Sequence, residues 1–293
     1  MTPVAFKRSI RDLQVWCSSC MVAFSGPDPI GVLIGAKRAS GTLVHKIAVH
    51  PDHRRQGHGR HLLESLGSKL AILGPPRMVA EVPEALAPAC ALFSACGYVQ
   101  EALLIDYVLS TPGDFVPRTP LHARSRGPHA PLPSRDSLAY ARSRLENDAR
   151  EGVRPPDDHY GRFVIPVTVD DLAANGLLPE TDQHDCWGRS VETLTARKDE
   201  IIGLAVASDE HIEAYLLYLT SEAGPEGTTE IVSLRSFVDD GGDRLKQLLS
   251  RLGVGTFWIP KVHPAEITND VLKALDFRPT GRHFIYAGKA RSG

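Results

Sequence analysis

The chain has 293 residues and a mass of 31.9 kDa, about twice the length of a typical domain, so two domains are expected. Hydrophobic residues make up 42% and charged residues 23% of the sequence, which excludes a wholly disordered or fibrous chain. A formal charge of -2 gives no general electrostatic reason to bind nucleic acid or an anionic membrane, and no apolar segment has membrane-spanning length. The five cysteines fit reduced thiols better than a disulfide framework. We therefore expect a cytoplasmic protein whose partners include neither nucleic acid nor membrane.

Residues 1–110 are predicted to form one α/β unit. Apolar residues at positions 6, 10, 13 and 17 share one face of a first helix. Three strands at 20–24, 30–36 and 42–50 are separated by turn residues and predict a meander. A leucine-rich helix over 62–73, a strand at 78–82, a helix at 85–96 and a strand at 103–109 follow. Helices that alternate with strands at this spacing indicate a layered α/β fold with a mixed sheet.

Residues 111–160 are predicted to be a linker with a helix, because six prolines and four arginines lie between positions 111 and 135. The arginines could contact phosphate, but no aromatic residues are interleaved with them, which favours a solvated connector. From residue 161 to 293 the order of elements recurs: a helix at 187–196, strands at 201–207, 211–219 and 230–237, a helix over 245–252, a strand at 256–262, a helix at 265–275 and a strand at 283–287. This recurrence predicts a tandem repeat of one fold.

Residues 43–63 carry the clearest chemical pattern. A β-branched strand ends at Val49, Pro51 stops the ladder, and a basic turn leads into an amphipathic helix. Gly57 and Gly59 remove the Cβ atoms that would keep a ligand away from the main chain. The first helical turn presents unpaired N–H groups at the positive end of the helix dipole.

Three arginines in the same turn, Arg54, Arg55 and Arg60, add fixed positive charge. Amides, dipole and guanidinium groups together suit a diphosphate better than a neutral ligand. The alternative is an ordinary arginine-rich helix start. No set of cysteines and histidines has a recognisable metal-ligand spacing, so no metal is expected.

The pattern Arg54-x-x-Gly57-x-Gly59 resembles the acyl-CoA pyrophosphate loop of the GNAT superfamily of N-acyltransferases. A second landmark of that superfamily, a helix that ends in glycine followed by an aromatic residue, is similar to the segment that ends in Gly97 and Tyr98. The resemblance covers roughly residues 6–109, in the expected order.

The resemblance implies a mixed sheet that opens between the fourth and fifth strands of the superfamily, with an acyl-CoA in the gap. Acetyl-CoA is the expected co-substrate, and a primary amine would attack its thioester directly in a ternary complex. The residues implied to hold the coenzyme are Ile47, Ala48, Val49, Arg54, Arg55, Gln56, Gly57, His58, Gly59 and Arg60.

The catalytic groups are less clear, because Phe93 and Leu86 stand where the superfamily often has a tyrosine and an asparagine. His45 is a candidate base, although strand alternation places it on the face of Leu43, Ile47 and Val49, where a core histidine is equally expected. Tyr98 is a weak candidate acid in a position that favours packing.

Three functions therefore stay open for the chain. The first is an N-acetyltransferase, the second a non-catalytic acyl-CoA-binding or regulatory protein, and the third an interaction module in which both units are inert. The acceptor amine is not defined by the sequence. Both a monomer and a homodimer are compatible with a tandem repeat.

The second unit differs at the position of the basic turn, where Asp239, Asp240 and Asp243 lie beside the helix start. These acids would cap the helix but repel a pyrophosphate, so this unit is predicted not to bind CoA there. It is expected instead to shape the acceptor pocket and to cover apolar surface of the first unit. A further hypothesis is that the strand-like residues 162–168 complete the first unit's sheet.

Overall fold

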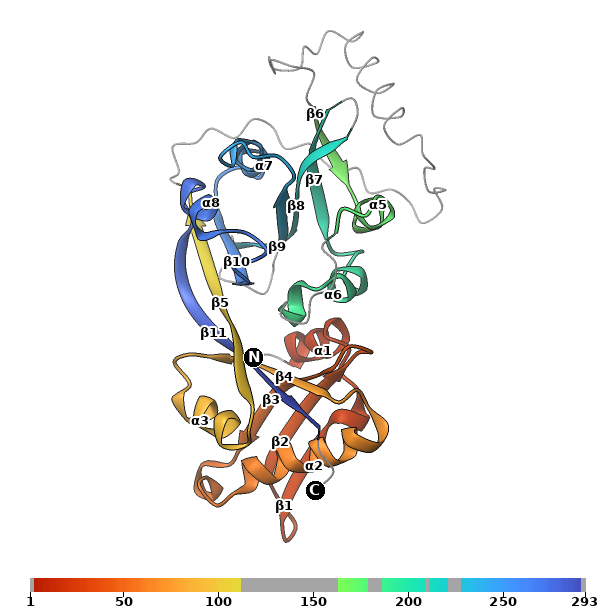
Figure 1. The fold of residues 1–293 in the computed structure, drawn as a ribbon, viewed down its shortest axis with the longest axis vertical. Coiled ribbons are helices and arrows are strands. Elements are labelled where there is room, and N and C mark those ends of the chain that lie inside the picture. The colour runs from red at the N-terminus through yellow and green to blue at the C-terminus, as the bar shows by residue number, and fades with distance from the viewer. Residues whose placement is uncertain (1–2, 112–162, 179–185, 209–210, 221–227, 291–293) are drawn as a thin grey trace.

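The computed structural model describes residues 3–111, 163–178, 186–208, 211–220 and 228–290 (Figure 1). The arginines of the predicted linker and the rest of residues 112–162 lie outside these ranges. None of the described helices is long and apolar enough to cross a membrane.

The first unit has the predicted order of elements. Its antiparallel meander is confirmed, and the helix over the leucines buries all of them except Leu73, which is 69% exposed at the helix end. The first helix is shorter than predicted, because Gln14 has a left-handed backbone with φ 58°. The elements are α1 (Pro3–Asp12), η1 (Cys17–Ser19), β1 (Met21–Ser25), β2 (Asp28–Lys37), β3 (Thr42–Val49), η2 (Pro51–His53), α2 (His58–Leu73), β4 (Arg77–Pro83), α3 (Ala87–Ala95) and β5 (Val99–Ser110).

The second unit repeats this order after one additional strand and helix. That helix, α5, was not predicted, although Thr168 and Asp171 form a capping box that is visible in the sequence. The elements are β6 (Phe163–Val167), α5 (Val169–Ala174), η3 (Trp187–Arg189), α6 (Val191–Ala196), β7 (Ile202–Ala207), β8 (Ile212–Thr220), β9 (Thr228–Ser236), α7 (Asp243–Arg251), β10 (Thr256–Val262), α8 (Asn269–Ala274) and β11 (Arg278–Lys289).

All strands join one 11-stranded sheet in the order β1-β2-β3-β4-β11-β5-β10-β9-β8-β7-β6. The two units therefore exchange their last strands. The final strand of the second unit, β11, lies beside β4 of the first, and β5 of the first unit lies beside β10 of the second. Figure 1 shows β5 and β11 running side by side between the two lobes, and they pair antiparallel with each other.

The hypothesis that residues 162–168 complete the first unit's sheet is wrong. The strand formed there, β6, pairs antiparallel with β7 at the far edge of the second unit. The position beside β4 is taken by β11, which pairs with it from His283↔Pro83 to Lys289↔Arg77. The physical reason is that β7 satisfies the hydrogen-bonding edge of β6, from Phe163↔Ala207 to Val167↔Gly203.

Helices cover one face of the first unit's sheet, and a segment of the second unit covers the other. Leucines of α2 and Phe93 of α3 pack with Met78, Ala80 and Val82 of β4 in one cluster. Trp187 packs on the opposite face with Ala36 and Leu43. The second unit thus covers apolar surface of the first, as predicted.

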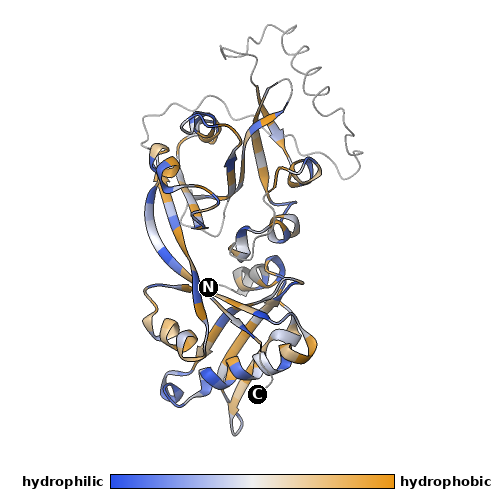
Figure 2. Ribbon diagram, in the orientation of Figure 1, coloured by the Kyte–Doolittle hydropathy of each residue, from blue (hydrophilic) through white to orange (hydrophobic). Residues whose placement is uncertain are grey.

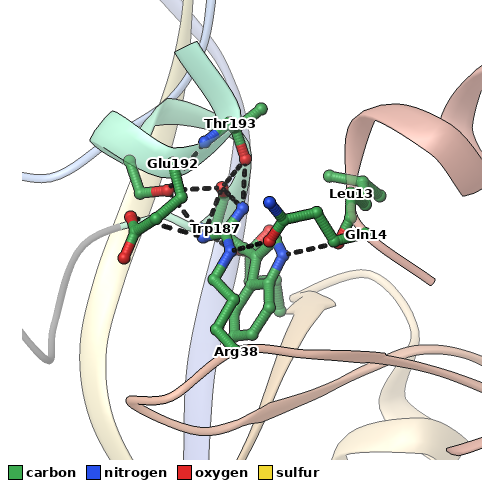
Figure 3. Close-up of polar contacts among 8 residues, drawn as sticks. Leu13, Gln14, Arg38, Trp187, Glu192 and Thr193 are labelled. Carbon is green, nitrogen blue, oxygen red and sulfur yellow. Dashed lines mark hydrogen bonds and ion pairs between the residues drawn. The ribbon is translucent and has the colours of Figure 1, made fainter. Parts of the chain in front are cut away.

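Arg38, just after β2, attaches this segment to the first unit (Figure 3). Its guanidinium donates hydrogen bonds to the hydroxyl oxygens of Ser190, at 2.6 Å, and Thr193, and it lies 4.0 Å above the Trp187 ring. The Trp187 indole N–H donates to the Leu13 carbonyl at 3.1 Å. Burial lowers the pKa of Arg38 to about 10, so the group stays charged near neutral pH. Arg38 is therefore a buried cation with hydrogen-bond partners. Such a group fixes the arrangement of the elements around it, here the end of β2 and the Trp187 segment.

The exchange predicts that the first unit does not fold alone. A fragment of residues 1–111 keeps β1 to β5, but both sheet neighbours of β5 belong to the second unit, and the edge of β4 is left bare. We expect this fragment to show no cooperative thermal transition by circular dichroism. Joining residues 277–290 to it through a flexible linker supplies β11 and is expected to restore that transition. A cooperative transition in the unextended fragment would contradict the prediction.

Candidate active site

The sheet of the first unit opens between β3 and β4. These parallel strands pair only at Thr42↔Met78 and Leu43↔Val79, near their first residues. Beyond that point β3 continues along β2 as far as Gly31↔Val49, and β4 continues along β11. The edge of β3 that carries Ile47, Ala48 and Val49 therefore faces a gap where no strand of the described residues pairs with it, which leaves room for an extended ligand.

A β-bulge at His45 changes the faces of β3. Ile34 of β2 lies opposite Lys46, and the next residue, Gly35, lies opposite Val44, so His45 is the extra residue. Leu43 packs with Trp187 on one face, whereas Ile47 packs on the other face with the cluster under α2. The expectation that Leu43, His45, Ile47 and Val49 share one face is therefore wrong, because the bulge interrupts the two-residue period.

His45 stands at the closed end of the gap in a partly buried position. Burial, assisted by Lys46 and Lys261, lowers its pKa to about 4, although Glu81 acts in the opposite direction. Its Nε2 atom is buried and has no hydrogen-bond partner among the described residues. The imidazole is thus neutral at physiological pH and has a free nitrogen.

The basic turn between β3 and α2 forms an exposed main-chain cradle. Arg55 and Gly57 have left-handed backbones, with φ 64° and 88°, and a Cβ built on Gly57 meets no atom within 4 Å. Gly57 is the N-cap of α2, and no side chain of the described residues caps this helix. Figure 2 shows hydrophilic residues in this turn and at the helix start. Free amides, helix dipole and nearby arginines make the turn an anion site in physical terms.

Two residues of the turn have structural contacts of their own. The Arg54 Nε donates to the Val49 carbonyl at 3.0 Å, which folds the loop back onto the strand end. A Cβ on Gly59 would lie 3.1 Å from the Leu92 side chain of α3. Gly59 therefore allows close packing of α2 against α3, whereas Gly57 leaves its main chain open to a ligand. Gln56, His58 and Arg60 also lie in this turn, with Gln56 and Arg60 exposed.

The aromatic residues near the gap form a packed group. Tyr98 is 9% exposed, its hydroxyl donates to the Met78 sulfur at 3.5 Å, and burial raises its pKa. Phe93 packs edge-on against Tyr98 and stacks on Tyr286 of β11, with ring centroids 5.8 Å apart. The phenol of Tyr98 is thus engaged in packing, on the helix-covered side of β4.

The second unit carries the same backbone features, but protein groups occupy them. Its helix α7 also starts after a left-handed glycine, Gly242, with φ 93°. The Asp240 carboxylate accepts hydrogen bonds from the Gly242 and Arg244 amides at 3.0 and 2.9 Å. A carboxylate of the chain itself therefore holds the place that an anionic ligand would take.

The corresponding gap between β9 and β10 is bridged by Arg189. These strands pair only from Thr256↔Thr228 to Trp258↔Glu230. Immediately beyond, the Arg189 guanidinium donates to the carbonyl of Ile231 on β9 at 3.1 Å and to that of Pro260 on β10 at 3.5 Å. It is buried and paired with Glu266.

A polar cluster on the face of β4 away from α2 was missed by the sequence reasoning. Glu81 of β4 accepts hydrogen bonds from the Lys261 ammonium, at 2.7 Å, and from the Trp187 amide, at 2.5 Å. Asp106 of β5 accepts from the Lys261 amide and from His283 Nε2, both at 2.8 Å. The opposing charge of Lys261 lowers the pKa of Glu81 despite its burial. The only sequence signal was charged residues inside strand patterns, because the cluster forms across four strands from both units.

Comparison with known proteins agrees with this architecture. Residues 16–100 match the family model described as the acetyltransferase (GNAT) domain. A search of curated proteins finds no match. Among solved structures, the chain is similar to a tandem GNAT protein from the clavulanic acid biosynthesis pathway, with TM-score 0.55, 17% identity, and coverage of 94% of this chain and 83% of that one.

Two further solved structures share the fold. A GCN5-related N-acetyltransferase from Sphaerobacter thermophilus has TM-score 0.53 and 14% identity, with coverage of 94% of this chain and 81% of that chain. The glucosamine N-acetyltransferase region of a fungal multi-domain GH3 beta-N-acetylglucosaminidase has TM-score 0.59 and 11% identity, with coverage of 92% and 33%.

Residues 16–100 of the first unit are thus similar to the acetyltransferase (GNAT) domain, and the chain shares the fold of the solved tandem GNAT structure. In the described part of the chain no group of histidine, cysteine and acidic residues is arranged to hold a metal ion.

The lowered pKa of His45 predicts a specific acid sensitivity. The unfolded chain binds a proton at this residue below about pH 6.5, whereas the folded protein does so only near pH 4, so stability falls as the pH drops through this window. Between pH 6.5 and 5 this group is expected to cost up to about 2 kcal/mol of unfolding free energy. Urea unfolding of the wild type and of His45→Gln at pH 7 and pH 5 measures this loss of unfolding free energy. An equal loss in the two proteins would contradict the prediction.

Proposed function

We propose that the first unit binds acetyl-CoA in the gap between β3 and β4 and transfers the acetyl group to a primary amine. The observation that carries this proposal is the contrast between the units. The helix start and strand gap are open in the first unit, whereas Asp240 and Arg189 occupy them in the second.

The main chain and the basic turn supply the binding groups for this substrate. The amides from Arg55 to Arg60 would hold the pyrophosphate, with Gln56 and His58 in the same turn. The free edge of Ile47, Ala48 and Val49 would pair with the pantetheine arm. A short acyl group is supported by the closure of the gap at Leu43↔Val79, where β3 and β4 pair.

The reaction needs a neutral amine, because an ammonium has no lone pair. The amine attacks the thioester carbonyl carbon, the C–N bond forms, and the C–S bond breaks to release the thiolate, which takes up a proton. His45, one of the two proposed catalytic residues, has a free nitrogen but is a weak base in its surroundings. Tyr98, the other, is held in packing with Met78 and is less suited to protonate the sulfur. Orientation of the two substrates in the gap can supply much of the acceleration.

The second unit is proposed to shape the acceptor side and not to bind CoA. Asp240 of its acidic turn is paired within the protein, since Arg244 pairs with both Asp240 and Glu213. Breaking these bonds to admit a pyrophosphate would leave buried charges without partners, at a cost of several kcal/mol.

Calorimetric titration with CoA tests the binding site. We expect one CoA per chain, and we expect Gly57→Glu to weaken binding at least about 100-fold, because it places a carboxylate in the cradle. Gly57→Ala is the matched control for backbone strain, since it adds a Cβ at the same positive φ without charge. Gly242→Glu in the second unit is expected to leave CoA affinity unchanged. Two bound CoA molecules, or equal effects of the two glutamates, would contradict the proposal.

Turnover separates an enzyme from a non-catalytic acyl-CoA-binding protein. Wild-type protein is mixed with acetyl-CoA and a panel of primary amines, and free thiol release is followed. Amine-dependent thiol release is expected, and it should disappear in Gly57→Glu. CoA binding without thiol release for any amine would favour the regulatory alternative.

A further inference from the structure

The imidazole of His283 lies among polar groups of the protein, and one of its nitrogens has no partner among the described residues. Its Nε2 lies 2.8 Å from Asp106 Oδ2, and its Nδ1 is buried without any hydrogen-bond partner among the described residues. Because a carboxylate accepts hydrogen bonds, Nε2 carries the proton and Nδ1 has the lone pair. A buried acceptor with no partner is costly unless a ligand or water satisfies it.

The surrounding backbone is arranged to hold this pair. The other carboxylate oxygen of Asp106 accepts from the Lys261 amide at 2.8 Å, and Lys261 has a left-handed backbone with φ 51°. Gly281 lies opposite Asp106 on β11, and a Cβ there would stand 2.5 Å from Asp106 Oδ2. A glycine and a strained lysine thus make room for the carboxylate and fix its direction, as at functional sites.

The strand exchange places His283 on the strand next to β4, which forms one side of the gap. His283 lies directly opposite Pro83, at the end of the part of β4 that has separated from β3. Ile285, two residues along β11, lies in a cluster with Cys186 and Leu104, on the face covered by the second unit. The basic turn and α2 lie on the other face, so His283 is on the face of the sheet that the second unit helps to form.

Resting on the proposed function, we propose that Nδ1 of His283, oriented by Asp106, accepts the proton of the acceptor amine. As the C–N bond forms, the amine proton moves to Nδ1, and the C–S bond breaks. The thiolate then takes up that proton directly or through water. His283 is the catalytic residue in this step, and Asp106 is its positioning residue.

Charged and titratable groups around His283 come from every neighbouring strand. They are Asp106 on β5, Glu81 on β4, Lys261 on β10 and Cys186 before η3, with the Arg282–Glu84 ion pair at 3.2 Å on the rim. Asp106 and Glu81 contribute two negative charges here, and Lys261 contributes one positive charge. This balance favours a cationic amine over an acidic acceptor. The Lys261 side chain is 32% exposed, so the cluster reaches solvent there.

The test compares His283→Gln with Arg282→Gln on the same strand. Glutamine can keep a hydrogen bond to Asp106 but has no basic nitrogen. We expect amine-dependent turnover of His283→Gln to fall about 100-fold, with unchanged CoA affinity, because the variant lacks the nitrogen that accepts the amine proton. Arg282→Gln should stay within about twofold of the wild type, since it changes only the rim pair.

Asp106→Asn is an independent test of the proposal. This variant keeps the His283 imidazole but can favour the tautomer in which Nδ1 carries the proton. It should lower turnover at least tenfold while leaving CoA affinity unchanged. Turnover of His283→Gln within twofold of the wild type overturns the inference, as does a wild type that binds CoA but acylates no amine. If His283→Gln does not fold, undiminished turnover of Asp106→Asn overturns it. A wild type that fails to bind CoA refutes the proposed function, which is a separate outcome.

Discussion

The structure depends on the exchange of β5 and β11 between the two units. Each strand completes the sheet of the other half, and the two strands pair with each other along their length. Neither half has a finished sheet by itself, because β4 would be left with a bare edge and β5 would have no partner. Backbone hydrogen bonds that must be satisfied therefore tie folding of the first unit to the presence of the last strand.

Side-chain contacts in the second unit explain how a repeated fold can have one open site. Both units start the corresponding helix at a left-handed glycine and both separate the corresponding strands. In the second unit Asp240 satisfies the helix amides and Arg189 satisfies the strand carbonyls, so that copy is complete without a ligand. In the first unit no side chain of the described residues caps the start of α2, and β3 and β4 separate beyond Leu43↔Val79.

The loss of one site is accompanied by a structural role for the second unit. Trp187 and the hydroxyls of Ser190 and Thr193 surround Arg38 and cover the face of β3 and β4 away from the helices. The same segment donates an amide to Glu81, and β10 and β11 add Lys261 and His283. The polar cluster built in this way therefore belongs to both units.

The sequence by itself determined the elements whose cause is local. Apolar periodicity, turn glycines and the basic loop predicted nearly every helix and strand, the tandem repeat and the cradle at Gly57, because these signals lie within a few residues of one another. It did not show the bulge at His45, which reverses the faces of β3, since a bulge depends on the partner strand. Only the tertiary structure decided the position of β11 and the joining of Glu81, Asp106, Lys261 and His283. Strand pairing across more than a hundred residues leaves no local pattern, because either partner is equally satisfied by any compatible edge.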